Sequence, residues 1–157
     1  MELKGHLARL AGAGAAIAFG STLLVGGATP AQAAPVYYQV INGNSSNACL
    51  QVVDAQTGKG NLVLGRCDRS AKQVWTISGG IFRNPASGHC LDGNGADVYS
   101  HPCNGGNHQK WTTTSGTAKS IKHNWSGKYL HADGDIGDQV VFRPTIGTAS
   151  RWVFDQL

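Results

Sequence analysis

Residues 90–111 read CLDGNGADVYSHPCNGGNHQKW, and another segment of the chain repeats their outline. Residues 49–75 also open on Cys-Leu, place a second cysteine eight residues before a tryptophan, and close on Gln-x-Trp. A looser third copy runs from Tyr129-Leu130 to Trp152 and has no cysteine. Trp75, Trp111 and Trp152 are 36 and 41 residues apart. Self-similarity at about forty residues predicts three structural units, which pack around a shared axis because none can bury its apolar face alone.

These three segments, called here the first, middle and third units, consist of short β-favouring runs. Val36–Ile41, Val74–Ile77 and Val140–Phe142 are examples, and many of the 22 glycines separate such runs. After residue 34 no stretch sustains the 3.6-residue period of an amphipathic helix. Many short strands between frequent turns are typical of an all-β sandwich or barrel.

The first 33 residues have the pattern of a secretory signal peptide. Lys4 and Arg9 flank the start, residues 10–27 are uncharged and apolar, and Ala31-Gln32-Ala33 offers a small-residue cleavage site. The apolar run is rich in glycine and alanine and is interrupted by polar residues, which makes a membrane anchor the weaker interpretation. We expect cleavage after Ala33, a single domain over 34–157, and a secreted, extracellular protein that is not attached to a membrane.

Charge gives no indication of a nucleic-acid partner. Without Glu2, Lys4 and Arg9, the 13 basic and 9 acidic residues of the chain fall to 11 and 8, a net charge of +3. The basic residues are scattered, whereas nucleic-acid binding requires a basic patch or stripe.

Four cysteines follow the expected signal peptide: Cys49, Cys67, Cys90 and Cys103. An even number of cysteines in an oxidising compartment predicts two disulfides. Three connectivities are possible, and the repeat favours Cys49–Cys67 and Cys90–Cys103.

Metal binding is a competing interpretation of the middle unit. His89, Cys90, His101, Cys103 and His108 fall within twenty residues and could form a zinc site. In a secreted chain the disulfides are favoured, so we expect no metal ion and no other cofactor.

The Q-x-W repeats and the Cys-Leu-Asp opening resemble the ricin-type β-trefoil lectins, a fold shared with family 13 carbohydrate-binding modules. The resemblance covers residues 34–157 and implies an all-β β-trefoil of three Q-x-W repeats with two intra-repeat disulfides. A buried tryptophan supplies a large apolar surface. The glutamine two residues earlier points to the same side of an extended strand, where its amide can satisfy loop backbone. We therefore expect structural roles for the following residues: Gln73, Trp75, Gln109, Trp111 and Trp152.

The middle unit contains the groups that a neutral sugar requires, namely a carboxylate for hydroxyl groups and aromatic rings for C–H faces. It is similar to the repeats of actinohivin-type trefoil lectins, which bind mannose-rich glycans, in its Leu-Asp, Val-Tyr, Pro-x-Asn-Gly-Gly and Gln-x-Trp elements. This resemblance implies that Asp92 accepts hydroxyl hydrogen bonds, that Tyr99 offers its hydroxyl and ring, and that Asn104 offers its amide. His101 and His108 stand where apolar or aromatic residues are usual, and we include both in the expected sugar site.

The outer units resemble degraded copies of this block. Gln51 and Val63 replace the aspartate and tyrosine in the first unit, and His131 and Val141 replace them in the third. Neither unit retains an acidic acceptor together with an aromatic ring, so one sugar site is predicted.

The sequence therefore favours a non-catalytic carbohydrate-binding protein for mannose-, galactose- or xylan-type glycans. A glycosidase needs two suitably spaced carboxylates, which Asp92 and Asp97 do not obviously provide, and no Gly-x-Ser-x-Gly motif is present. The alternative is a secreted trefoil protein–protein interaction or inhibitor module with vestigial sugar sites, since a fold does not determine function. Trp125, outside the repeat register, fits either a capping core residue or a ligand contact.

Overall fold

The structure is a computed structural model that describes residues 33–56 and 58–157. Apart from Ala33, the expected signal peptide lies outside the described residues. Within these ranges the chain forms twelve β-strands and three short 3-10 helices, η1 (Ala71–Gln73), η2 (Asn107–Gln109) and η3 (Thr148–Ser150). No helix in the described part of the chain is long and apolar enough to cross a membrane.

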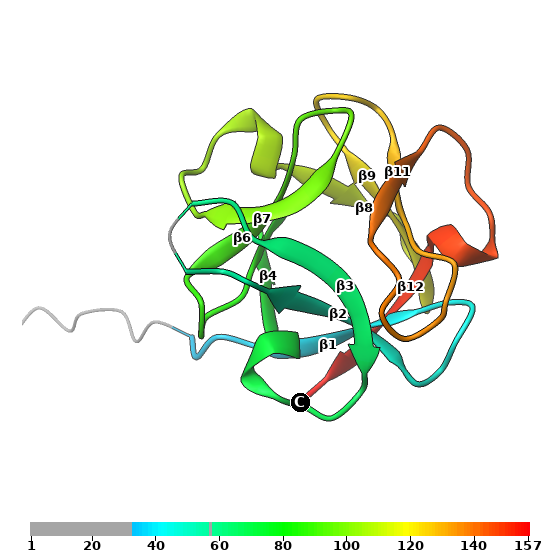
Figure 1. The fold of residues 1–157 in the computed structure, drawn as a ribbon, viewed down its shortest axis with the longest axis horizontal. Helices are drawn as coiled ribbons and strands as arrows, with labels where there is room; N and C mark the ends of the chain where they lie inside the picture. Colours follow the sequence, from blue (N-terminus) through cyan, green and yellow to red (C-terminus); the bar gives the residue numbers. More distant parts are fainter. Residues whose placement is uncertain (1–32, 57) are drawn as a thin grey trace, which may run out of the picture. The chain divides into compact units, whose positions relative to one another are not determined.

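Six strands form a barrel around the core (Figure 1). They are β1 (Tyr37–Asn42), β4 (Trp75–Ser78), β5 (Ile81–Arg83), β8 (Trp111–Thr113), β9 (Ala118–His123) and β12 (Arg151–Gln156). β1 pairs with β4 and β12, β4 with β5, and β9 with β8 and β12, all antiparallel. Between β5 and β8, the Trp111 amide donates to the Gly80 carbonyl at 2.9 Å, which closes the ring of strands.

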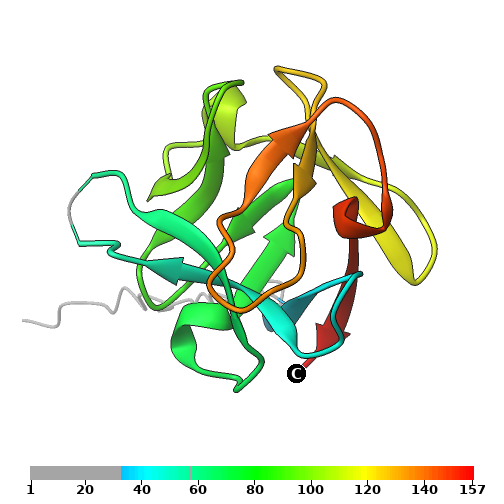
Figure 2. The same ribbon diagram turned by 45° about the vertical axis from the view of Figure 1, so that its right-hand side comes forward.

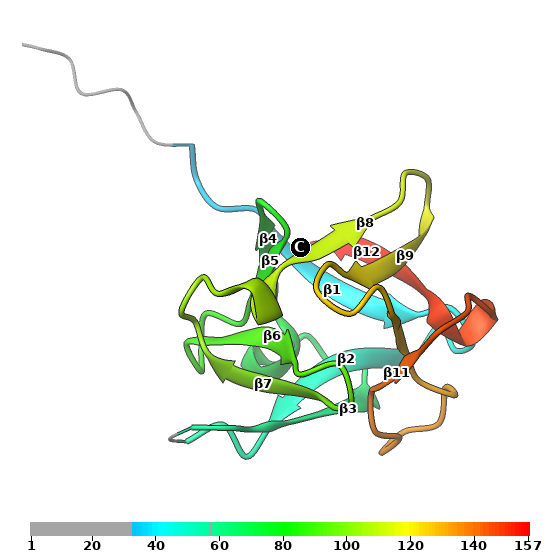
Figure 3. The same ribbon diagram turned by 90° about the horizontal axis from the view of Figure 1, so that it is seen from above.

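Three hairpins cover one end of this barrel, one from each unit (Figure 3). They are β2 (Ala48–Val53) with β3 (Asn61–Arg66), β6 (His89–Gly93) with β7 (Val98–Pro102), and β10 (Tyr129–His131) with β11 (Val141–Arg143). The 3-10 helices follow the hairpins and lie at three separate places around the periphery (Figure 2). This arrangement confirms the predicted all-β trefoil of three repeats.

The tryptophan of each unit makes the same contact at the centre of the core. Its indole N–H donates to the carbonyl of the leucine that opens the unit: Trp75 to Leu50 at 3.0 Å, Trp111 to Leu91 at 3.0 Å, and Trp152 to Leu130 at 3.1 Å. The three tryptophans are at most 2% exposed, and the leucines are fully buried. Each tryptophan therefore joins a barrel strand to the hairpin of its own unit while it fills the space between them.

Two disulfides pin the first two hairpins, as predicted. Cys49 bonds to Cys67, and Cys90 bonds to Cys103. All four cysteines are thereby used, which removes the sulfur ligands of the alternative zinc site. In the third unit Tyr129 stands before Leu130 where the other units have a cysteine.

A buried polar side chain ties the segment before each hairpin to a 3-10 helix of another unit. Asn84 donates to Ala71 O at 2.8 Å, Asn42 donates to Ala149 O at 3.4 Å, and His123 Nε2 lies 3.0 Å from His108 O. All three side chains are at most 1% exposed. These three residues are equivalent anchors, although one is a histidine and no sequence pattern aligns them.

Replacing Trp75 by phenylalanine tests the contribution of the tryptophan contact. The change leaves the buried Leu50 carbonyl unpaired and creates a cavity, so we expect the free energy of unfolding to fall by about 2–4 kcal/mol. Urea denaturation followed by circular dichroism measures the loss. The same substitution at the 57% exposed Trp125 is the matched control, with an expected change within about 0.5 kcal/mol. Equal losses at the two positions would contradict the structural role.

Candidate functional site

Asp92 and Tyr99 lie directly opposite each other on the hairpin β6–β7. Opposed residues of an antiparallel pair share one face, so the carboxylate and the phenol are neighbours on the same face of the hairpin. Asp92 is 3% exposed and Tyr99 is half-buried. Burial, together with the negative charge of Asp92, raises the pKa of Tyr99 to about 12. The phenol therefore stays protonated at neutral pH and keeps its ability to donate a hydrogen bond.

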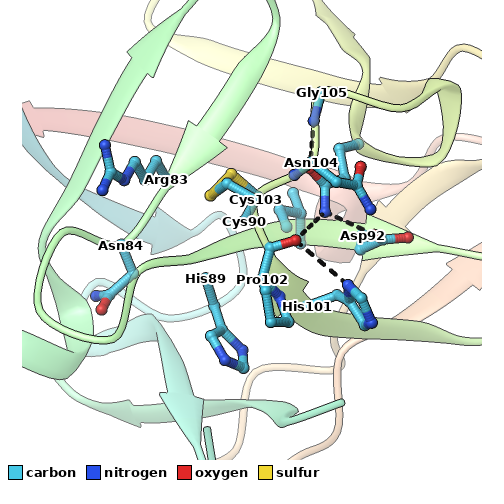
Figure 4. The surroundings of a disulfide bond; sticks show 12 residues. Arg83, Asn84, His89, Cys90, Asp92, His101, Pro102, Cys103, Asn104 and Gly105 are labelled. Atoms are coloured by element: carbon cyan, nitrogen blue, oxygen red, sulfur yellow. Dashed lines mark hydrogen bonds between the residues drawn. A yellow bond between two sulfur atoms is a disulfide. The ribbon is translucent and has the colours of Figure 1, made fainter. Parts of the chain in front are cut away.

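Gln109, the glutamine of the second Q-x-W, holds the Asp92 carboxylate in place. Its Nε2 donates to Asp92 Oδ2 at 2.9 Å and to Pro102 O at 3.0 Å. Its Oε1 accepts the backbone N–H of Asn104 at 2.9 Å. The side chain thus connects β6, the end of β7 and the loop before η2. This cluster lies beside the Cys90–Cys103 disulfide (Figure 4).

The other carboxylate oxygen of Asp92 is buried, and although the Tyr99 hydroxyl approaches the carboxylate, this oxygen has no partner with hydrogen-bond geometry. Among the residues that the structure describes, Asp92 Oδ1 is the one buried side-chain nitrogen or oxygen that lacks a partner. An unsatisfied buried acceptor costs about 1–3 kcal/mol, and more when it is charged. Such an atom in a native fold calls for an explanation, and an acceptor reserved for a ligand donor is one.

His101 and Asn104 lie on either side of Pro102 and Cys103 at the end of β7. His101 is two residues after Tyr99 on the same face, with ring centroids 6.5 Å apart, and is half-buried. Asn104 is exposed, and its Oδ1 accepts the Gly106 N–H at 2.8 Å. The carbonyl half of the Asn104 side chain thus stabilises the turn, and its Nδ2 group has no hydrogen-bond partner among residues 33–56 and 58–157.

His108 is held by two contacts that the sequence did not suggest. Its Nδ1 lies 2.9 Å from Gly93 O, and its ring packs on Trp125 with centroids 4.6 Å apart. Because a carbonyl can only accept, Nδ1 carries the proton and Nε2 of the neutral ring is an acceptor. The structure therefore places His108 at the border between the hairpin β6–β7 and the turn that contains Trp125.

Lys59 covers Tyr99 from the β2–β3 loop of the first unit. Its Nζ lies 4.1 Å from the centroid of the Tyr99 ring and 3.9 Å from Asp97 Oδ2. A bridge between Gly60 and Ser100 brings the loop to β7. Lys59, Asp97 and Tyr99 line part of a hollow of about 150 Å³. Lys59 belongs to a different repeat from the rest of the site, so no pattern within the middle unit indicates it.

The outer units have no counterpart of the open Asp92 oxygen. Gln51 lies opposite Val63, and its Oε1 accepts Gln73 Nε2 at 2.9 Å. His131 lies opposite Val141, and its two ring nitrogens are each 2.9 Å from an oxygen, of Ser150 and Asp133. The acceptor oxygen at this position is therefore bonded in the first unit, and both ring nitrogens are bonded in the third.

Two buried histidines lie close to the site. His89 contacts Ser100 Oγ at 3.1 Å, and burial, followed by the charge of His101, lowers the pKa of His89. His123 contacts Ser126 Oγ at 2.9 Å and His108 O at 3.0 Å, and burial is the main cause that lowers the pKa of His123. Both imidazoles are therefore held neutral within the fold.

The chain is similar to known trefoil proteins. The family model described as "Ricin-type beta-trefoil lectin domain" matches residues 36–152. The designed 3-fold symmetric protein ThreeFoil is 21% identical, with a TM-score of 0.70 over 77% of this chain and 99% of its own. The C-half of the earthworm R-type lectin, solved in complex with GalNAc, is 12% identical, with a TM-score of 0.66 over 78% of this chain and 100% of its own. At these identities both show the fold alone.

The hemolytic lectin CEL-III is 27% identical, with a TM-score of 0.64 over 76% of this chain. The match covers 30% of CEL-III, so this chain corresponds to a minor part of that protein. No curated protein matches the chain.

Acidification is expected to destabilise the protein through His89 and His123. Their pKa values are below 6.5 in the folded state and near 6.5 in the unfolded chain, so the unfolded chain binds more protons at mildly acidic pH. Stability should be complete above pH 6.5 and decrease as pH falls toward the folded pKa values. Urea unfolding between pH 7.5 and 5 measures this.

The variant His123→Asn places at this anchor the residue found at positions 42 and 84. We expect it to flatten the pH dependence of the free energy of unfolding. A wild-type stability that is constant or rises as pH falls to 5 would contradict the assignment.

Proposed function

The chain belongs to the ricin-type β-trefoil lectin family, and from this premise we propose that it is a secreted, non-catalytic carbohydrate-binding protein with one sugar site, in the middle unit. The observation that carries the proposal is the buried, unpaired Oδ1 of Asp92, which accepts a hydroxyl group of the sugar. The family supports carbohydrate binding in general, and the position of the site rests on this atom.

Binding uses four groups around that oxygen. Gln109 fixes the carboxylate through Oδ2, so Oδ1 is oriented before the ligand arrives. The protonated phenol of Tyr99 and the free Nδ2 of Asn104 supply further hydrogen bonds, and the His101 ring offers an apolar surface for C–H groups. Because water competes for each bond, the net gain is about 1 kcal/mol per hydrogen bond. A single sugar is therefore bound on the order of micromolar to millimolar.

The ligand class that we propose is a mannose-, galactose- or xylan-type glycan. Sugars with neighbouring hydroxyl groups suit a carboxylate acceptor, whose charge-assisted hydrogen bonds are roughly twice as strong as neutral ones. Similarity of the middle unit to the actinohivin-type repeats points toward mannose-rich glycans and remains a prediction. The earthworm lectin solved with GalNAc shows a galactose-type ligand on the same fold.

Binding without catalysis is supported by the surroundings of Asp92. Glycoside hydrolysis requires a second carboxyl group across the scissile bond. Asp92 is hydrogen-bonded to an amide, and Asp97, the other aspartate of the hairpin, lies 3.9 Å from the Lys59 ammonium.

Secretion is supported by the two disulfides, because such bonds form and persist in oxidising compartments. The signal-peptide pattern of residues 1–33 agrees with this proposal. The alternative function, a protein–protein interaction or inhibitor module, has its support in the loss of the acceptor from the first and third units, and the next experiment separates the two.

The variant Asp92→Asn tests the site. The new amide still accepts the Gln109 hydrogen bond through its oxygen, but the charge and the free acceptor are lost. We expect the affinity for the bound glycan to fall roughly tenfold or more, since 1.4 kcal/mol corresponds to a factor of ten. A glycan array identifies the ligand, and titration calorimetry compares the variants.

Asp135→Asn is the matched control, because Asp135 is exposed and its carboxylate makes no hydrogen bond among the described residues. Its affinity should equal that of the wild type. Absence of binding to any glycan would favour the protein–protein alternative, and equal affinities of the two variants would remove Asp92 from the site.

A further inference from the structure

Trp125 differs from the other tryptophans of the chain. Trp125 is 57% exposed, whereas Trp75, Trp111 and Trp152 are at most 2% exposed. Trp125 lies in the turn between β9 and β10, at the start of the hairpin of the third unit. An exposed tryptophan of this size suggests a contact surface rather than a core residue.

The fold itself does not require a large residue at this position. Trp125 follows the buried anchor His123 by two residues, and Ala86 follows the equivalent anchor Asn84 by two residues. Gly88 N donates to Asn84 O at 3.0 Å just as Gly127 N donates to His123 O at 2.8 Å, so the turns have the same hydrogen bonding. The turn after Asn84 therefore forms with an alanine in place of the tryptophan, and a hollow of about 220 Å³ lies beside Ala86.

The Trp125 ring is held in place by the middle unit. One side leans on the tip of the hairpin β6–β7, where a Cβ atom at Gly95 would lie 2.8 Å from the ring; Gly95 also has a φ of +84°, which favours glycine. The centroids of the His108 and Trp125 rings are 4.6 Å apart, and Lys128 Nζ donates to Gly95 O at 2.6 Å. The ring is thus supported on one side and open to solvent on the rest of its surface.

A hollow of about 410 Å³ lies beside the ring, lined by Trp125, Asn107, Lys110 and Asn124. Asn124 Oδ1 accepts the Thr112 hydroxyl at 2.7 Å, which orients its Nδ2 group as a donor. The side chain of Asn107 makes no hydrogen bond within the described residues. A flat aromatic ring flanked by amide and ammonium donors is the combination that binds the C–H face and the hydroxyl groups of a pyranose.

The short helix η2 connects this hollow with Asp92. Its last residue, Gln109, binds the Asp92 carboxylate at 2.9 Å, and its first residue, Asn107, lines the hollow. A 3-10 helix has three residues per turn and rises about 2 Å per residue, so the backbones of these two residues are less than one turn apart. His108, between them, contacts Gly93 on one side and Trp125 on the other.

We propose that the hollow at Trp125 is a second subsite, which binds the neighbouring residue of an oligosaccharide whose first sugar is held by Asp92. The inference rests on the proposed function and extends it: the protein recognises a chain of at least two sugars rather than a single one. Trp125 stacks on the C–H face of the second sugar, and Asn107 and Asn124 donate to its hydroxyl groups.

The test uses the wild-type protein and the glycan that binds it best, supplied as mono-, di- and trisaccharide. Because Trp125 is the one exposed tryptophan, acrylamide quenching of the fluorescence reports on its surface directly. We expect the di- and trisaccharide, but not the monosaccharide, to reduce the quenching constant. We also expect the disaccharide to bind at least tenfold more tightly than the monosaccharide.

Two variants separate binding from folding. Trp125→Ala reproduces the alanine of the equivalent turn, and Asn107→Ala removes a side chain without a hydrogen bond in the fold. Each should lower the affinity for the disaccharide, roughly tenfold for Trp125→Ala and severalfold for Asn107→Ala, and leave the monosaccharide affinity within twofold. Ile136→Ala, at another apolar residue that is 52% exposed, is the matched control and should change neither affinity.

The outcomes distinguish the two proposals. If Asp92→Asn abolishes binding but Trp125→Ala binds the disaccharide as well as the wild type, the subsite is wrong and the proposed function stands. If glycans bind and Asp92→Asn has no effect, the site at Asp92 is wrong, and a Trp125-dependent affinity would then belong to a separate site. If no glycan binds, both proposals fail.

Discussion

The hydrogen bond from a buried indole N–H to a leucine carbonyl is the contact on which the trefoil depends. It occurs once in each unit, between the first residues of a barrel strand and the opening strand of a hairpin. The large ring fills the centre of the core, and the N–H fixes its orientation, because a misplaced ring would leave a buried donor and a buried acceptor unpaired. The positions of the hairpins, and hence of every group in the site, follow from this contact.

The position that Asp92 occupies in the middle unit has different hydrogen bonds in each of the three units. Gln51 and His131 find partners within their own unit, so this position adds to the stability of the outer units. Asp92 uses one oxygen for Gln109 and leaves the other without a partner. The middle unit therefore gives up some stability at this place, and its disulfide and the Trp111 contact hold the surrounding hairpin in shape. Binding sites commonly lose some folding stability locally, and the rigid structure around them compensates for the loss.

The sequence predicted the features that repeat and missed those that join one repeat to another. The tryptophan spacing indicated three packed units, the resemblance to ricin-type lectins implied the trefoil, and the repeat favoured the two disulfides that the structure contains. Asp92 and Tyr99 were expected together, and the register of β6–β7 places them opposite each other. Lys59 over Tyr99 and His108 against Trp125 could not be predicted, because these contacts join residues from different units and depend on how the hairpin tips pack. The side-chain oxygen of Asn104 stabilises a turn. Asparagine commonly has this role in loops, and the sequence allowed it beside a role in sugar binding.

The contact between Lys59 and Tyr99 limits how far this protein can be regarded as three interchangeable parts. The loop between β6 and β7 is shorter than the loop between β2 and β3 and has no counterpart of Lys59; it contains Gly95, which must remain small because Trp125 lies against it. A symmetric protein assembled from three copies of the middle unit would carry three Asp92 carboxylates, but it would lack the β2–β3 loop that places Lys59 over Tyr99. Duplication of the middle unit would therefore repeat the Asp92 acceptor but would not reproduce the contact between Lys59 and Tyr99. The pocket is therefore a property of the asymmetric whole: the first unit, whose Gln51 oxygen is bonded to Gln73, contributes the Lys59 ammonium group beside Tyr99 of the middle unit.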